Sequence, residues 1–244
     1  MKTFNELGDI FILTGAGISK ESGLDTFRDQ DGLWAKHPID DVATPEGFQK
    51  NPKLVQKFYN HRRAELKKVT PNAAHEALAK LESMWPGKVT LVTQNVDDLH
   101  ERAGSQNIIH MHGRLKEIRC VETGKVFPWE RDLEVSDKCE CCDKKGNLRP
   151  NIVWFGELPV DLPRIFQALD TCDYFLSIGT SGNVYPAGGF AQHVQMRGGV
   201  HLAEFNIDDS EITHLFQQHY KGPATTTVPT FVETLIQKLK SNAI

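Results

Sequence analysis

The sequence lacks any apolar run of the roughly 18–20 residues that a membrane-spanning helix needs, and it lacks internal repeats and low-complexity segments. It also has no excess of positive charge, because 28 Lys and Arg residues stand against 32 Asp and Glu residues, for a net charge of −4. We therefore expect no nucleic-acid partner and no binding to an anionic membrane. Met1 to Glu6 lead almost directly into an apolar segment and leave no room for a signal peptide, so we expect a cytoplasmic protein.

The sequence does contain enough apolar material for a large core. Of its 244 residues, 39% are apolar and 25% are charged, which is typical of one globular domain or of one domain with a smaller insertion. There are five cysteines, and four of them lie between Cys120 and Cys142. This odd number and this clustering indicate a metal site rather than disulfides.

A glycine-rich turn follows the first apolar segment. Residues 10–13 predict a buried strand, Gly15 and Gly17 allow a tight turn, and we expect a helix from about Ser19. A strand, a glycine turn and a helix N-terminus in this order can cradle a pyrophosphate. The third glycine of the G-x-G-x-x-G pattern is absent, since position 20 is Lys20. Taken alone, the loop therefore fits an ordinary glycine-rich turn equally well.

Further apolar segments also end in polar or glycine-rich residues. We expect strands at 89–93, 108–113, 151–156, 174–178 and 201–206, and helices at 45–68, 73–84, 166–169 and 230–239. This alternation predicts an α/β fold with a doubly wound parallel sheet, in which ligands bind outside the carboxyl ends of the strands. Five such ends make a dinucleotide site the leading interpretation: 15–17, 94–97, His112, 179–181 and Asn206.

Several of these segments match one family in order. The sequence resembles the sirtuins, the NAD-dependent protein deacylases, over residues 9–224 through Gly15-Ala16-Gly17-Ile18-Ser19, Phe27-Arg28, Gln94-Asn95-Val96-Asp97, His112-Gly113, Phe155-Gly156-Glu157 and Gly179-Thr180-Ser181. Leu24-Asp25 departs from the Ile-Pro that is usual in the family. The resemblance implies a Rossmann-like large domain from residues 1–27, 76–113 and 157–244. It also implies a small module from two insertions, a helical one at 28–75 and a cysteine-bearing one at 114–156.

The resemblance implies a particular chemistry. The carbonyl oxygen of an acyl-lysine attacks C1′ of the NAD ribose, nicotinamide leaves, and the acyl group ends on ADP-ribose. His112 would be the general base, since an imidazole titrates near neutral pH. His110 lies on the same strand face and is its rival by spacing, and the His-Gly match decides for His112. Asn95 and Asp97 would hold the nicotinamide carboxamide and a water; the alternative is an Asx turn that caps the next helix, which we prefer for Asp98.

The implied NAD contacts come from the strand ends and from the residues after the first loop. Ser19 and Arg28 would meet phosphate or ribose, and Phe27 would cover the reacting sugar. The full set is Gly15, Ala16, Gly17, Ser19, Phe27, Arg28, Trp34, Gln94, Asn95, Asp97, Gly179, Thr180, Ser181, Asn206 and Ala224. On the substrate side, the segment that contains Val153, Phe155, Gly156 and Glu157 would pair with the peptide backbone as an added strand.

A pair of residues on a predicted helix suggests which acyl groups fit. Tyr59 and Arg62 are three residues apart and share one helix face. A guanidinium with a phenol hydroxyl suits a carboxylate. Class III sirtuins, which include the bacterial CobB type, are similar here and accept succinyl-lysine as well as acetyl-lysine, and Ala43 matches the small residue that widens their pocket. The alternative is a solvated basic helix face, because Arg63 follows directly.

The cysteines match a zinc ribbon only in part. Cys139 and Cys142 form one C-x2-C pair, and Cys120 begins another whose partner position holds Thr123. Cys120, Cys139 and Cys142 could hold one structural zinc ion, with Cys141 or a water as the fourth ligand. The alternative is a module that has lost its metal.

These residues together predict a monomeric enzyme that removes acetyl and succinyl groups from protein lysines with NAD as co-substrate. A mono-ADP-ribosyltransferase would use the same NAD cleavage. A nicotinamide dehydrogenase is disfavoured, because the Tyr-x-x-x-Lys pair of short-chain dehydrogenases is absent. A non-catalytic reader of NAD or of acyl-lysine is the third alternative.

Overall fold

Six parallel strands form the larger sheet of this computed structural model, which describes residues 8–26 and 37–242. Their order across the sheet is β3-β2-β1-β7-β8-β9. The bounds are β1 Ile10–Thr14, β2 Val89–Thr93, β3 Ile108–His110, β7 Tyr174–Ile178, β8 His201–Asn206 and β9 Gln218–Lys221. The order changes direction at β1, so the carboxyl ends of β1, β2 and β7 meet at one edge, where α/β sheets bind their ligands.

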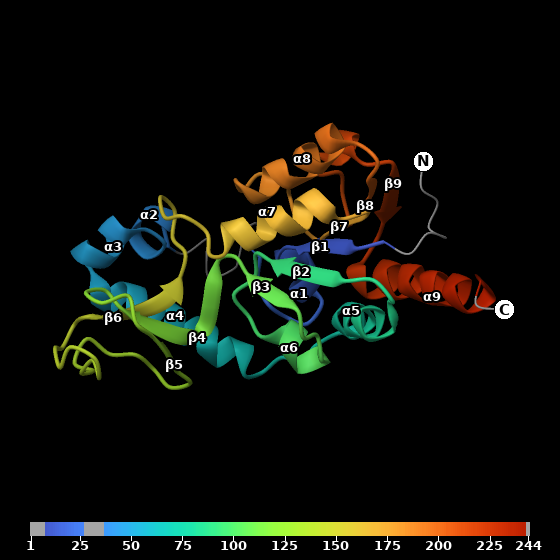
Figure 1. The fold of residues 1–244 in the computed structure, drawn as a ribbon. Coiled ribbons are helices and arrows are strands. Elements are labelled where there is room, and N and C mark those ends of the chain that lie inside the picture. The colour runs from blue at the N-terminus through green and yellow to red at the C-terminus, as the bar shows by residue number, and fades with distance from the viewer. Residues whose placement is uncertain (1–7, 27–36, 243–244) are drawn as a thin grey trace.

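Helices cover both faces of this sheet (Figure 1). Alternate residues of each strand point to opposite faces, so Ile10 and Ile12 pack against one helix layer while Phe11 and Leu13 pack against the other. The first layer contains α1 Ala16–Lys20, α5 Ala73–Met84 and α9 Ala224–Asn242, and the second contains α7 Leu162–Thr171 and α8 Phe190–Arg197. Apolar residues on both sides explain why these strands appear in the sequence as continuous apolar runs.

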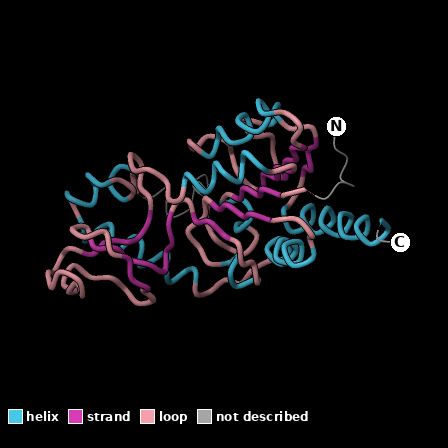
Figure 2. Tube along the Cα trace, in the orientation of Figure 1, coloured by secondary structure: helices cyan, strands magenta, loops and turns pink. Residues whose placement is uncertain are grey.

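A three-stranded antiparallel sheet, in the order β5-β4-β6, lies beside the large sheet in Figure 1. Its strands are β4 Gly113–Cys120, β5 Val126–Pro128 and β6 Leu148–Ile152, and next to it lie α2 Ile39–Val42, α3 Pro45–Lys50 and α4 Pro52–Leu66. Figure 2 shows that the cysteine-bearing segment between β5 and β6 is mostly loop. The predicted fold class, a Rossmann-like sheet with a smaller cysteine-bearing module, is confirmed.

Several predicted elements need correction. The single helix expected at 45–68 is two helices, because Asn51 ends α3 and caps α4, accepting the Leu54 N–H at 3.1 Å, and Pro52 starts the new helix. The strand expected at 151–156 ends at Ile152, and the one expected at 108–113 ends at His110. We did not predict α2, α8 or β9, whose residues have a weak apolar pattern.

The C-terminal helix is longer than predicted. It begins at Ala224, whereas the sequence favoured a start at Thr230, directly after Pro229. A proline inside a helix removes one hydrogen-bond donor, and here Phe231, Leu235 and Ile236 pack α9 against the sheet and hold the helix together across it. None of the described helices combines the length and the apolar character needed to cross a membrane.

Candidate active site

The glycine turn brings the ends of β1 and β7 into contact. Gly15 N–H donates to the Ile178 carbonyl at 3.0 Å, and Gly17 N–H donates to the Gly179 carbonyl at 2.9 Å. A Cβ on Gly15 would lie 2.7 Å from the Gly179 oxygen, and one on Gly17 would lie 2.7 Å from the Gly179 Cα. Helix α1 begins at Ala16, with Gly15 as N-cap, and not near Ser19 as predicted. Both glycines are therefore needed so that two strand-end loops can touch.

Asn95, Asp97 and Ser19 form a buried cluster at the same edge. Asn95 Nδ2 donates to the Gly15 carbonyl and to Ser19 Oγ, both at 3.1 Å, and Ser19 Oγ donates to Asp97 Oδ2 at 3.0 Å. Burial raises the pKa of Asp97, although hydrogen bonds from Leu99 and Ser19 oppose this shift. The sequence-predicted pair thus faces one site together with the first loop.

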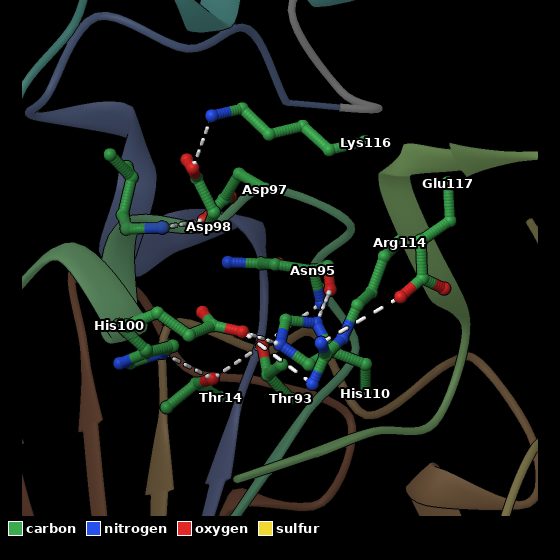
Figure 3. A network of polar contacts seen from close by, with 12 residues as sticks. Thr14, Thr93, Asn95, Asp97, Asp98, His100, His110, Arg114, Lys116 and Glu117 are labelled. Atoms are coloured by element: carbon green, nitrogen blue, oxygen red, sulfur yellow. Dashed lines mark hydrogen bonds and ion pairs between the residues drawn. The ribbon is translucent and has the colours of Figure 1, made fainter. Parts of the chain in front are cut away.

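Asp97 fits the helix-capping alternative, while its role toward nicotinamide stays a prediction. Its Oδ1 accepts the Leu99 N–H at 3.1 Å and so caps α6, Leu99–Ala103. The capping role that we expected for Asp98 is wrong, because Asp98 occupies the N-cap position without a side-chain cap bond. It forms an ion pair with Lys116 at 2.8 Å instead, as Figure 3 shows.

The two rival histidines differ in their partners. His112 Nδ1 lies 3.0 Å from the Gln94 carbonyl, which can only accept, so Nδ1 carries the proton and Nε2 keeps a free lone pair. Burial lowers the pKa of His112, and the bond to Gln94 opposes this only in part. His110 Nε2 lies 2.6 Å from Glu101 Oε1, and its Nδ1 lies 3.4 Å from the Asn95 carbonyl (Figure 3). Both ring nitrogens of His110 are engaged, which favours His112 as the base.

Other strand ends are joined to this edge. Gln94 Nε2 donates to Thr180 Oγ1 at 2.9 Å, and Asn206 Nδ2 donates to the Thr180 carbonyl at 2.9 Å. Gly179 N–H donates to the Phe205 carbonyl, Ser181 follows in the same loop, and Ala224 begins α9. The structure therefore brings the predicted NAD contacts of β2, β7 and β8 together. Phe27, Arg28 and Trp34 lie outside the described residues.

A cavity of about 400 Å³ opens beside His112. Its lining includes His112, Ala43, Tyr59, Arg62 and the segment from Val153 to Glu157. A smaller cavity of about 210 Å³ contains Asp97 and Asp25, and Arg62 lines both cavities. The residues predicted for the acyl group and the predicted base therefore share one space.

In the acyl pocket, Tyr59 is buried and Arg62 is half-buried. Tyr59 is 1% exposed, and burial raises its pKa to about 12. Burial lowers the pKa of Arg62, while the nearby Tyr59, Asp97 and Asp25 raise it. The alternative of a solvated basic face is contradicted for Arg63, which is 3% exposed and donates to the Leu115 carbonyl at 2.8 Å.

The segment after β6 is a turn, not a strand. Val153 N–H donates to the His112 carbonyl at 2.9 Å, and Phe155 N–H donates to the Ala43 carbonyl at 3.0 Å. Glu157 binds Arg149 through both carboxylate oxygens and is 2.6 Å from Arg119. Pairing of this segment with a substrate backbone stays a prediction, and it would rest mainly on carbonyl groups because these N–H groups are used within the chain.

Four thiols meet in the smaller module. The sulfurs of Cys120, Cys139, Cys141 and Cys142 all lie within 4.8 Å of one another. Cys141 therefore lies where it could fill the open place in the predicted set, and Thr123 Oγ1, where the second cysteine of the usual pair would stand, lies 3.0 Å from its sulfur. Four cysteine sulfurs are a donor set that structural zinc takes, so this cluster could hold one zinc ion.

A doubly wound parallel sheet, a glycine turn at its edge and a buried Asn-Asp pair beside a histidine define a dinucleotide-using α/β enzyme. The model of the Sir2 family matches residues 15–186. A curated relative from Bdellovibrio bacteriovorus, named NAD-dependent protein deacylase, is 54% identical over 94% of this chain and 97% of its own length.

Solved structures agree with this match. A Sir2 homologue in complex with NAD has a TM-score of 0.88 at 37% identity, covering 98% of this chain and 93% of its own. A Sir2 protein bound to an acetylated peptide has a TM-score of 0.80 at 27% identity, covering 97% and 95%. The chain belongs to the Sir2 family and is an NAD-dependent enzyme, as the resemblance to the sirtuins predicted.

Proposed function

We propose that this chain is an NAD-dependent protein deacylase that removes both acetyl and succinyl groups from lysine side chains. The observation that carries the proposal is the single cavity in which His112, Tyr59 and Arg62 all take part. The relatives' name and the acetyl-peptide complex of a related structure support protein deacylation in general. The buried phenol of Tyr59 and the half-buried guanidinium of Arg62 support the acidic acyl group.

At the NAD end, the chain offers a polar pocket on a rigid frame. NAD supplies the bond between ribose and nicotinamide whose cleavage activates the sugar. Asn95 and Asp97 would hold the carboxamide, since Ser19 and the Gly15 carbonyl fix both side chains. Gln94 and Thr180 are bonded to each other at 2.9 Å and would meet the ribose and the phosphates. This joint anchoring keeps the reacting sugar next to His112.

His112 acts as the general base. The Gln94 carbonyl fixes the tautomer with the proton on Nδ1, which leaves Nε2 able to accept a proton from a ribose hydroxyl. Because burial lowers the pKa of this imidazole, the ring is neutral at physiological pH. A neutral imidazole at this place can take a proton in every turnover, and the acyl group then leaves as O-acyl-ADP-ribose.

At the acyl end, Arg62 and Tyr59 would receive a carboxylate. A guanidinium remains charged in proteins and offers several N–H donors, and a phenol offers one O–H. Ala43 is small and leaves room for the longer acyl chain. An acetyl group needs less space and no charged partner, so the same cavity accepts both.

The test compares matched acetyl-lysine and succinyl-lysine peptides, with and without NAD, by mass spectrometry. We expect each peptide to lose its acyl group only with NAD, and we expect nicotinamide and O-acyl-ADP-ribose among the products. ADP-ribose attached to the peptide would show the alternative, a mono-ADP-ribosyltransferase. Intact succinyl peptide beside deacylated acetyl peptide would refute the desuccinylase part alone.

A further inference from the structure

We propose that Trp154 is a specificity-determining positioning residue, which aims the hydroxyl of Tyr59 at an acidic acyl group. The inference rests on the proposed role of Tyr59 in binding a carboxylate. Tyr59 lies on α4 and Trp154 follows β6, two elements that lie side by side in Figure 1. Trp154 Nε1 lies 2.9 Å from the Tyr59 hydroxyl oxygen, and both side chains are at most 2% exposed.

The hydrogen-bond chemistry fixes the direction of this contact. An indole N–H can only donate, so the Tyr59 oxygen accepts from Trp154 and keeps its own proton for another partner. Among the described residues, no acceptor for that proton is found, and the neighbouring Arg62 has only N–H donors to offer. The phenol also stays protonated, because burial raises its pKa to about 12. Within the part of the chain that the structure describes, the hydroxyl therefore keeps its proton as a donor, and Tyr59 lines the cavity.

Trp154 is itself held firmly. The Arg149 guanidinium carbon lies 3.2 Å from the centre of the Trp154 ring, and the Phe48 ring centre lies 5.4 Å away. Glu157 binds Arg149 at 2.7 and 2.9 Å and also accepts the backbone N–H of Trp154 at 2.8 Å. The indole therefore cannot turn away from Tyr59 without losing its stacking on Arg149, which the ion pair with Glu157 holds in place.

This arrangement matters for one class of substrate. A carboxylate oxygen is a strong acceptor, and in a buried cavity its bond to a pre-aimed O–H gains strength from the low dielectric. The methyl group of an acetyl-lysine accepts no hydrogen bond, so it gains nothing from the aimed hydroxyl. Trp154 should thus act on the choice between acyl groups, and only through Tyr59.

The experiment measures kcat/KM for succinyl and acetyl peptides and uses their ratio, so that any general effect on turnover cancels. Trp154→Phe keeps an aromatic ring but removes the N–H, and we expect the succinyl-to-acetyl ratio to fall roughly three- to tenfold, mainly through KM, as for one ordinary hydrogen bond. Phe48→Leu disturbs the packing of Trp154 without touching the N–H and is the matched control. We expect this control to keep the ratio within about twofold, since no hydrogen bond is lost.

A double variant decides whether Trp154 acts through Tyr59. If it does, Tyr59→Phe combined with Trp154→Phe has the same ratio as Tyr59→Phe alone. An additional, multiplicative loss in the double variant, or an unchanged ratio in Trp154→Phe, would overturn the inference while leaving the role of Tyr59 intact. An unchanged ratio in Tyr59→Phe would overturn the proposed desuccinylase function, and this inference with it.

Arg149→Lys provides a second route if Trp154→Phe does not fold. It weakens the support of the indole without removing the N–H. We expect a smaller fall in the ratio, which disappears in the Tyr59→Phe background. A fall of equal size in that background would show that Arg149 acts independently of Tyr59, and it would count against the inference.

Discussion

Replacing Arg62 by methionine tests the acyl pocket most directly. Methionine keeps much of the length and the apolar stem of arginine but removes the charge and all N–H donors. Arg62 lines the cavity shared by Tyr59 and His112. Without the guanidinium, a succinyl carboxylate in this cavity would keep only the Tyr59 hydroxyl as a donor. We therefore expect desuccinylation to suffer far more than deacetylation.

The magnitude follows from the loss of a charged hydrogen bond. Such a bond contributes roughly 1.5–3 kcal/mol, which corresponds to a fall of about 10- to 150-fold in kcat/KM for the succinyl peptide at roughly 1.4 kcal/mol per factor of ten. Burial raises the pKa of Asp97 and the charge of Arg62 opposes that rise, so part of the loss will be common to both peptides. The ratio of the two kcat/KM values removes that common part.

The assay follows both peptides by mass at several concentrations. Lys67→Met is the matched control, because Lys67 is an exposed basic residue just after α4, the helix that carries Arg62. It loses one positive charge at the surface, where screening makes such charges weak, and the ratio should not change. Equal losses on both peptides in Arg62→Met would refute the reasoning, as would the same change of ratio in Lys67→Met.

Three further predictions follow from other parts of the molecule. His112→Ala should abolish deacylation of both peptides without changing the melting temperature by more than a few degrees, and near-full activity would remove His112 as the base. Metal analysis should find about one zinc per chain. Cys141→Ser should lower this zinc content, and adding Thr123→Cys to that variant should restore it. Full zinc content in Cys141→Ser would exclude Cys141 as a ligand. Burial lowers the pKa of His75 from 6.5 to about 4, so the unfolded state binds more protons in that range, and His75 should cost about 3 kcal/mol of unfolding free energy as the pH falls from 6.5 to 4. Denaturant titrations at several pH values measure how the free energy of unfolding depends on pH. His75→Gln should make this dependence weaker while keeping a side chain able to cap α5. An unchanged pH dependence would contradict this role of His75.

The ends of some strands could be predicted from sequence, because these strands are mainly apolar runs that stop at a polar residue or a glycine. Val89–Thr93 and Tyr174–Ile178 are examples, and their bounds are those expected. The matching order of motifs then identified the family before any contact was known. Helix periodicity predicted that Tyr59 and Arg62 share one helix face, and both residues line one cavity.

The remaining features depend on contacts between distant segments. The spacing rule for zinc ribbons left open whether Cys141 or a water completes the set, and only the folded loop brings its sulfur to the other three. Trp154 belongs to an apolar, aromatic segment that we predicted to be a strand. No local pattern indicates that its indole N–H reaches Tyr59, 95 positions earlier. The break at Asn51-Pro52 was visible in the sequence, but the apolar pattern on both sides concealed it.

The close approach of Gly15 and Gly17 to Gly179 sets a limit on how this enzyme can be altered. Loops at the end of a sheet are usually where variation is tolerated and where new specificity is introduced. Here a methyl group at either glycine would strike the backbone of the neighbouring loop, not a side chain that could move aside. Libraries aimed at a different co-substrate should therefore leave these three positions fixed and vary the wall of the acyl cavity, where the chain can change shape without separating its two central strands.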